Sequence, residues 1–110
     1  MALQDVHSKK ISIAVSAGPG TNTVVAAVSG AWIYVHEVIG DLDVDGTITF
    51  KSGSTILGAL TVDDGQGITL SDEPGEDNRP RFECIPGDDF VIHLSAGSTF
   101  KGIVHYSLRY

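Results

Sequence analysis

Three aspartates at alternate positions form the pattern in this chain that most resembles a metal-binding motif. The segment Asp41-Leu-Asp-Val-Asp-Gly46 has the D-x-D-x-D-G spacing with which a calcium loop surrounds a hard cation with carboxylate oxygens. The match then fails, because the twelfth position is Ser52 instead of a glutamate, and the residues between are typical of a strand. We therefore predict no metal and interpret the segment as an acidic turn, with Asp41, Asp43 and Asp45 as weak calcium candidates.

Three histidines lie in segments that we expect to be strands, where they could bind a metal or transfer protons. Within residues 86–110, the alternating segments 90–95 and 103–108 predict one antiparallel hairpin, in which His93 and His105 are cross-strand neighbours on the wetter face. No Cys or His lies at the short spacing of a metal-ligand pair, such as H-x-H. We interpret His36, His93 and His105 as ordinary strand histidines, with a subunit interface as an alternative setting.

No catalytic motif accompanies these residues. The sequence contains no G-x-S-x-G, no phosphate-binding loop and no H-E-x-x-H. The acidic residues of segment 71–80 would lie in a loop that is too polar to raise a carboxyl pKa by desolvation. The single cysteine, Cys84, excludes an intrachain disulfide, and its neighbours Phe82 and Ile85 favour a buried, space-filling role. We expect a protein that is not an enzyme and has no cofactor.

Composition sets the class of protein that must position these residues. The chain has 110 residues, of which 42% are hydrophobic and 19% charged, as expected for one globular domain with one core. No apolar run approaches the ~20 residues of a membrane span, and the start is too polar for a signal peptide. We therefore expect a soluble protein made in the cytoplasm, without a membrane partner. The net charge of −7 would repel phosphate backbones, which argues against nucleic acid as a partner.

Alternating and β-branched segments, separated by Gly-rich turns, recur along the whole chain. They predict an all-β, single-domain antiparallel β-sandwich of the jelly-roll type, although spacing alone does not separate it from another Greek-key order. Residues 1–9 lack any periodicity and are interpreted as a flexible N-terminal arm before a domain over 10–110. We expect strands at residues 11–16, 22–28, 31–39, 44–51, 54–62, 67–70, 81–85, 90–95 and 103–108.

The segment 31–39 is the strongest strand, and its two sides differ in chemistry. One side is mostly aliphatic and is predicted to face the core, with one charged misfit: Ala31, Ile33, Val35, Glu37 and Ile39. The other side, with Val38, is aromatic and amphipathic. It makes Trp32, Tyr34 and His36 candidate subunit-interface residues, since Trp and Tyr are enriched in interface cores. Packing under a loop of the same subunit is the alternative.

Three segments resemble small β-sandwich virion proteins of tailed bacteriophages. They are TVVAAVSGAWIYV, TITFKSGST-x-x-GAL and PGDDFVIHLSAGSTFKGIVHYSL, and the likeness covers Asn22 to Tyr106. The acidic segment 71–80 departs from the shorter, more apolar segment expected in this family. The matching positions are turn glycines and fold-determining residues: Val24, Gly30, Phe50, Ser52, Gly53, Gly58, Pro86, Gly87, Leu94, Ser95, Gly102 and Tyr106.

The resemblance implies a capsid decoration (cement) protein on the outer surface of the virion. Such a protein would be a homotrimer that binds the major capsid protein and stabilises the assembled shell, with Lys9 and Lys10 of the arm contacting neighbouring capsid subunits. An acidic protein fits the outer shell, because it does not bind the packaged genome. The alternative is a tail- or head-fibre adhesion module that binds host-surface carbohydrate through Trp32 and Tyr34.

Overall fold

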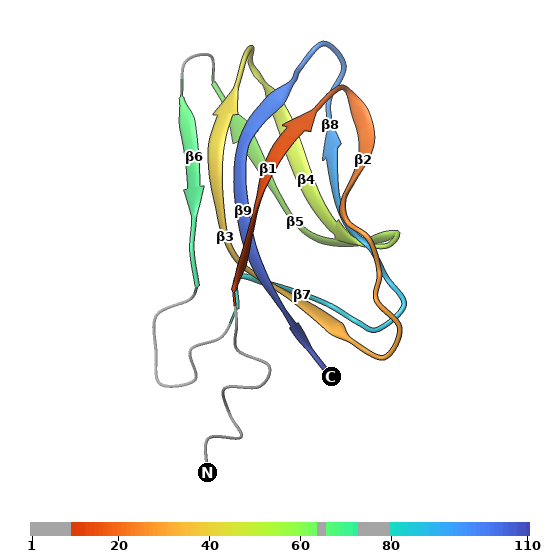
Figure 1. Ribbon diagram of the computed structural model, residues 1–110. Helices are drawn as coiled ribbons and strands as arrows, with labels where there is room; N and C mark the ends of the chain where they lie inside the picture. Colours follow the sequence, from red (N-terminus) through yellow and green to blue (C-terminus); the bar gives the residue numbers. More distant parts are fainter. Residues whose placement is uncertain (1–9, 64–65, 73–79) are drawn as a thin grey trace.

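The described part of the chain contains nine strands, and each overlaps one of the expected segments (Figure 1). The computed structural model describes residues 10–63, 66–72 and 80–110. No helix in this described part is long and apolar enough to cross a membrane. The strands are β1 (Ile11–Ala17), β2 (Gly20–Val25), β3 (Trp32–Leu42), β4 (Gly46–Ser52), β5 (Thr55–Val62), β6 (Gly67–Leu70), β7 (Phe82–Cys84), β8 (Phe90–Leu94) and β9 (Phe100–Arg109).

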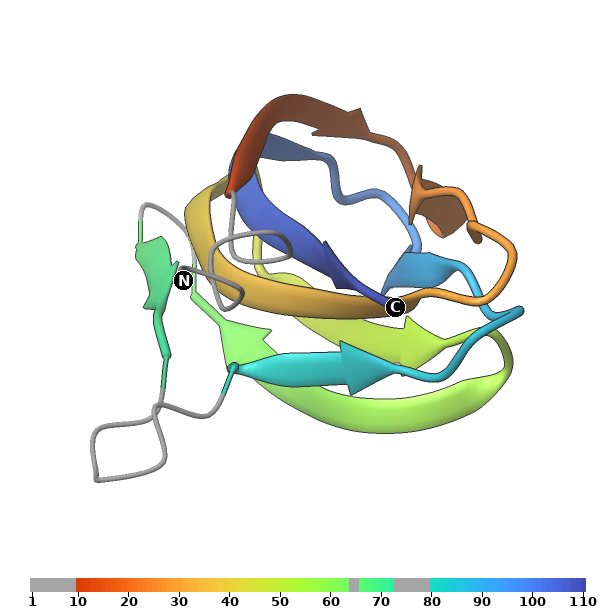
Figure 2. The same ribbon diagram turned by 60° about the horizontal axis from the view of Figure 1, so that its bottom comes forward.

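The strands form two antiparallel sheets that pack face to face. Sheet A has the order β1-β9-β3-β6, with β7 also paired to β3, and sheet B has the order β2-β8-β4-β5. In Figure 2, β3 and β9 run side by side, with β4 and β5 in the other layer. The pairs β1·β9, β2·β8, β3·β6 and β4·β5 are nested in sequence, which is the strand order of a jelly roll. The expected β-sandwich is confirmed.

The hairpin expected within residues 86–110 is wrong. β8 pairs with β2 and β4 in sheet B, whereas β9 pairs with β1 and β3 in sheet A, so their connection crosses the sandwich. An alternating pattern shows which side chains are buried, but it does not show which strand lies alongside. His93 and His105 therefore lie on the outer faces of different sheets and are not neighbours.

The core lies between the sheets and is built from the inward rows of both. The rings of Phe50 and Phe82 stack with their centroids 4.7 Å apart, and Phe90 lies 6.4 Å from Phe50. Cys84 is fully buried beside this aromatic group, as predicted. Burial raises the pKa of its thiol to about 11, so the thiolate does not form near neutral pH.

A β-bulge at His36 changes which residues of β3 face the core. Val35 pairs with Tyr106 and Glu37 with His105, so His36 is an extra residue without a place in the register. Beyond the bulge Val38 is buried, whereas Glu37 and Ile39 point outward. The prediction that Glu37 and Ile39 face the core, with Val38 outside, is wrong. A one-residue shift exchanges the two sides of a strand. The charged Glu37 in the predicted core row was the sign in the sequence that the alternation is interrupted.

Candidate interaction surface on the outer face of sheet A

The outward side chains of sheet A form cross-strand rows that differ in chemistry. These rows follow from the pairing of β9 with β1 and β3 and of β3 with β6. A polar row, an apolar row and a charged row lie next to one another. They are Ser12–His105–Glu37, Ala14–Ile103–Ile39–Thr69 and Ser16–Lys101–Asp41.

The bulge directs His36 into a partly buried hydrogen-bonded array on this face. Its Nδ1 lies 3.0 Å from Asp72 Oδ1, and its Nε2 lies 2.7 Å from Ser107 Oγ. Because a carboxylate only accepts, the Nδ1–H of His36 donates to Asp72, and Nε2 of an imidazole in that tautomer accepts from the Ser107 hydroxyl. The array joins β3, β9 and Asp72, the second residue after β6, and thus holds the start of segment 71–80 against the sheet.

This hydroxyl–imidazole–carboxylate order is that of a nucleophile, its base and an orienting acid in hydrolases. In this protein, however, the Ser107 side chain lies within β9, where it is paired with Tyr34 and only 2% exposed. A substrate carbonyl cannot reach a buried Oγ, so the contacts favour a structural role. That the chain is not an enzyme stays a prediction.

Sequence reasoning chose His36 but missed both of its partners. Asp72 is 36 residues away and Ser107 is 71 residues away, so only the strand order brings the three together. The misfit Glu37 was the one available sign, because it points to the bulge that turns His36 out of register.

A second polar group lies beside the array and surrounds a shallow pocket of about 180 Å³. His105 Nδ1 lies 2.8 Å from Ser12 Oγ, and its Nε2 lies 3.6 Å from Glu37 Oε1. The exposed Lys10 places its Nζ 3.9 Å from Asp72 Oδ2. In the described part of the chain no three His, Cys, Asp or Glu side chains are grouped as a metal site would require.

One end of this face is aromatic. Trp32 is 38% exposed and meets Tyr34 edge to face, with ring centroids 6.5 Å apart. The Arg109 guanidinium lies 5.1 Å above the Tyr34 ring, a cation–π contact. Trp32 therefore offers apolar surface to a partner, while the half-buried Tyr34 is held in place by its neighbours.

An apolar patch that sequence reasoning missed occupies the middle of the face. Ile39 and Ile103 are direct cross-strand partners and are 40% and 46% exposed. Ala14 is paired with Ile103 on the other side. The bulge puts Ile39 outside, so the patch could not be found without the register of β3.

The three aspartates of the calcium-like segment lie at the end of β3 and in the connection to β4. Asp43 Oδ1 accepts a hydrogen bond from the Thr99 backbone N–H at 2.7 Å, which lowers the pKa of that carboxyl. Asp41 lies at the end of β3, in register with Lys101, and Asp45 lies in the exposed turn before β4. The three weak calcium candidates are thus not grouped as a metal site. The expected arm, residues 1–9 with Lys9, lies outside the described residues.

Comparisons with known proteins give one similarity in structure. No family model matches the sequence, and no curated protein sequence matches it. A solved structure from Bacillus endospore appendages, described as a novel family of disulfide-linked pili, is 17% identical in sequence. It is similar over 93% of this chain and 84% of its own, with a TM-score of 0.48. The similarity to this structure concerns the all-β fold alone.

Proposed function

We propose that this protein is a structural, non-enzymatic component of a larger assembly, and specifically that it decorates the outer shell of a bacteriophage head as a homo-oligomer. The observation that carries the proposal is the outer face of sheet A. It exposes Trp32, Ile39 and Ile103 on a rigid sheet, beside a polar group that is already organised. Exposed apolar side chains with a polar surround are typical of protein–protein contact sites.

Net charge supports a place on the outside of the shell. The chain has 14 acidic residues against seven Lys and Arg, and a surface of that sign is repelled by packaged nucleic acid. Attachment would therefore rest on contacts with the major capsid protein, to which Lys9 and Lys10 contribute from the start of the chain.

Several copies acting together explain how a small domain could stay attached. An oligomer that engages several capsid subunits at once is retained far more strongly than one domain is. Because it binds the assembled shell and not its free subunits, it stabilises the shell by mass action. The homotrimer that the resemblance implies is the form we propose for the capsid-bound state.

Co-sedimentation with capsids tests the proposal. The protein is mixed with empty heads assembled from the major capsid protein of the same genome, and its bound fraction is measured in a sucrose gradient. We expect saturable binding that Trp32→Ala and Ile103→Lys each weaken by about tenfold or more. Thr49→Lys, on the outer face of sheet B, is the matched control and should bind like wild type. Absence of saturable binding by the wild-type protein would contradict the proposal.

Carbohydrate binding is the second candidate, and the exposure of Trp32 favours it. A sugar ring could stack on that indole, but Arg109 already covers one face of Tyr34, so a two-ring platform is not preformed. Titration with host-surface glycans, followed by Trp32 fluorescence, separates the two functions. A saturable change in fluorescence without any binding to capsids would favour the adhesion module.

A further inference from the structure

The edge of β1 is open and carries none of the usual devices against strand pairing. In the described part of the chain β1 pairs with β9 alone, through seven residue pairs from Ile11–Tyr106 to Ala17–Phe100 without a register shift. Natural edge strands are blunted by charges, prolines, bulges or shortness. The sequence of β1, ISIAVSA, has no charge and no proline, and its backbone is regular.

The other edge strands each carry such a device. Edge strand β2 has an extra residue, Val24, between the pairs that Thr23 and Val25 make with β8. Edge strand β5 has an extra residue, Leu57, where its register with β4 shifts. At the remaining edge of sheet A, β6 has four residues and β7 three. β1 is therefore the one described edge that can accept a long, regular partner strand.

The residue types of β1 are symmetric about Ala14: a polar or apolar residue on one side has a residue of the same type at the same distance on the other. Two serines flank this centre at equal distances, Ser12 and Ser16. In an antiparallel pair of β1 strands about a two-fold axis at Ala14, Ser12 therefore meets the partner's Ser16. On the inner side, apolar residues meet apolar residues: Ile13 meets the partner's Val15, and Ile11 meets the partner's Ala17.

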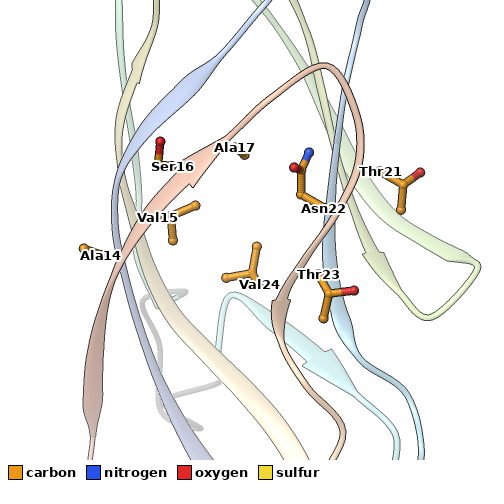
Figure 3. Close-up of a pocket in the computed structure, with 8 residues that line it drawn as sticks. All are labelled: Ala14, Val15, Ser16, Ala17, Thr21, Asn22, Thr23 and Val24. Atoms are coloured by element: carbon orange, nitrogen blue, oxygen red, sulfur yellow. The ribbon is translucent and has the colours of Figure 1, made fainter.

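A groove beside β1 has room for the inward side chains of such a partner. It lies between β1 and β2, has a volume of about 420 Å³, and is drawn in Figure 3. Val15 and Val24 point toward each other across it, while Ala14 points to the other side of β1. Both valines are only partly buried, but the exposed lining of the groove is otherwise mostly polar, so the pairing would rest on backbone hydrogen bonds more than on apolar contacts.

The turn that joins β1 to β2 holds this edge in place before any partner arrives. Asn22 Nδ2 donates to the Gly18 carbonyl at 2.8 Å and the Gly20 carbonyl at 3.1 Å, and Asn22 Oδ1 accepts from the Gly18 N–H at 3.3 Å. A preorganised edge loses little conformational freedom when it binds.

We propose that two copies of this chain pair through β1, antiparallel about a two-fold axis at Ala14, so that sheet A continues from one copy into the other. Seven paired residues give about six to eight backbone hydrogen bonds between the copies. The pairing is isologous, so it closes on itself and does not propagate. The outer faces of sheet A, with Ile39 and Ile103, then form one continuous surface.

The pair is expected to be weak in free solution. A single strand pair buries less than the roughly 1,600 Å² of a standard stable interface, so the dissociation constant should lie in the micromolar range. Light-scattering mass is measured from about 5 to 500 µM, where we expect a rise from 11.6 kDa toward about 23 kDa, twice the chain mass.

Lysine substitution tests the position of the interface. Ala14→Lys puts two like charges in direct opposition at the proposed axis, so the rise in mass above 11.6 kDa should move to concentrations at least about tenfold higher than in wild type. Ala59→Lys is the matched control, because Ala59 is also an exposed, outward-facing alanine on an edge strand, β5. It should dimerise like wild type. Loss of the dimer in Ala59→Lys but not in Ala14→Lys would overturn the proposal.

Cysteine cross-linking tests the register. Ala14→Cys places two thiols opposite each other within disulfide distance, so mild oxidation should give a covalent dimer, whereas Ala59→Cys should not. The native thiol does not interfere, because Cys84 is fully buried and its pKa is raised to about 11. Failure of Ala14→Cys to cross-link, with wild type at 11.6 kDa throughout, would show the pairing to be wrong.

The result of the dimerisation experiments is independent of the result of the capsid-binding experiment. A mass near 35 kDa, three times 11.6, that is unchanged by Ala14→Lys would overturn the β1 pair while agreeing with a trimer. A β1 dimer that does not bind capsids would leave the pair standing and contradict the decoration function.

Discussion

The outer faces of the two sheets were built by the same alternation of residues, yet they differ in chemistry. Sheet A presents Trp32, Ile39 and Ile103 together with the His36 array. Sheet B presents mostly hydroxyl side chains, with one large exposed aliphatic residue, Ile56, beside Lys51. The other outward residues of sheet B are Thr21, Thr23, Thr47, Thr49, Thr61, His93, Ala59 and a buried Val91. Threonine fits a pleated sheet that faces water, because it is β-branched and polar.

The two outer faces show which positions of this fold are free to vary. The inner rows of both sheets must be apolar to make one core, so they tell little about function. The outer rows are under no such constraint, and sheet A uses them for exposed apolar groups that are costly to leave in water without a partner. The contrast supports the proposed partner contacts on sheet A, where three exposed apolar side chains lie on one face, whereas sheet B exposes a single large one, Ile56, among threonines.

The largest effect is expected from glycines, because the backbone of sheet A is closely packed at one point. Gly40 and Gly102 are cross-strand partners, and a Cβ on Gly102 would overlap the Ile39 carbonyl oxygen and lie 2.7 Å from Gly40 Cα. Gly102→Ala should lower the free energy of unfolding by about 3 kcal/mol, measured by urea denaturation.

Gly58 of sheet B is the matched control for that substitution. A Cβ there would make an ordinary contact, 3.4 Å from the Phe82 ring. Gly58→Ala should change the free energy of unfolding by no more than about 0.5 kcal/mol. Equal losses in the two variants would mean that the close approach in sheet A is not what requires glycine.

The two histidines give the next largest contrast. His36→Ala leaves the Ser107 hydroxyl buried without its partner, so we expect a loss of about 2 kcal/mol in urea denaturation at pH 7. His93→Ala on sheet B removes only an exposed contact with Thr21 and should cost less than about 0.5 kcal/mol.

A double variant separates hydrogen bonding from packing in the array. Because it removes the buried hydroxyl as well, His36→Ala with Ser107→Ala should recover part of the loss of His36→Ala alone. If the double variant is less stable by the sum of both single losses, the array does not act as a unit.

The inner rows could be predicted from the sequence, whereas the neighbours of each strand could not. Phe90, Ile92 and Leu94 are buried as the alternation requires, because a period of two fixes the sides of a regular strand. The predicted hairpin failed because many strand orders bury the same rows, and the number of residues in a turn does not choose among them.

The candidate site was only partly predictable for the same reason. Trp32 and Tyr34 lie before the bulge of β3, so simple alternation placed them correctly on the outer face. Ile39 lies beyond the bulge, and its side was predicted wrongly. Ser107 and Asp72 reach His36 only through the strand order, which local sequence does not encode.

The smallest effect is expected at the seam where the chain passes from sheet A to sheet B. Asp43 lies in the β3–β4 connection, and its carboxylate accepts the Thr99 N–H of the β8–β9 connection at 2.7 Å. This backbone hydrogen bond lowers the pKa of the Asp43 carboxyl below its usual 3.8, so the ionised form is the one that the fold stabilises.

Acid titration of stability checks this contact. A carboxyl whose pKa is lowered by folding contributes stability above its unfolded pKa and loses it as the pH falls through the lower, folded value. Asp43→Asn keeps an acceptor for Thr99 and removes only the charge, so it should lower the thermal midpoint slightly at pH 7 and not at all near pH 2. If Asp43→Asn lowers the thermal midpoint equally at pH 7 and near pH 2, the negative charge of Asp43 does not contribute to stability, and the prediction is wrong.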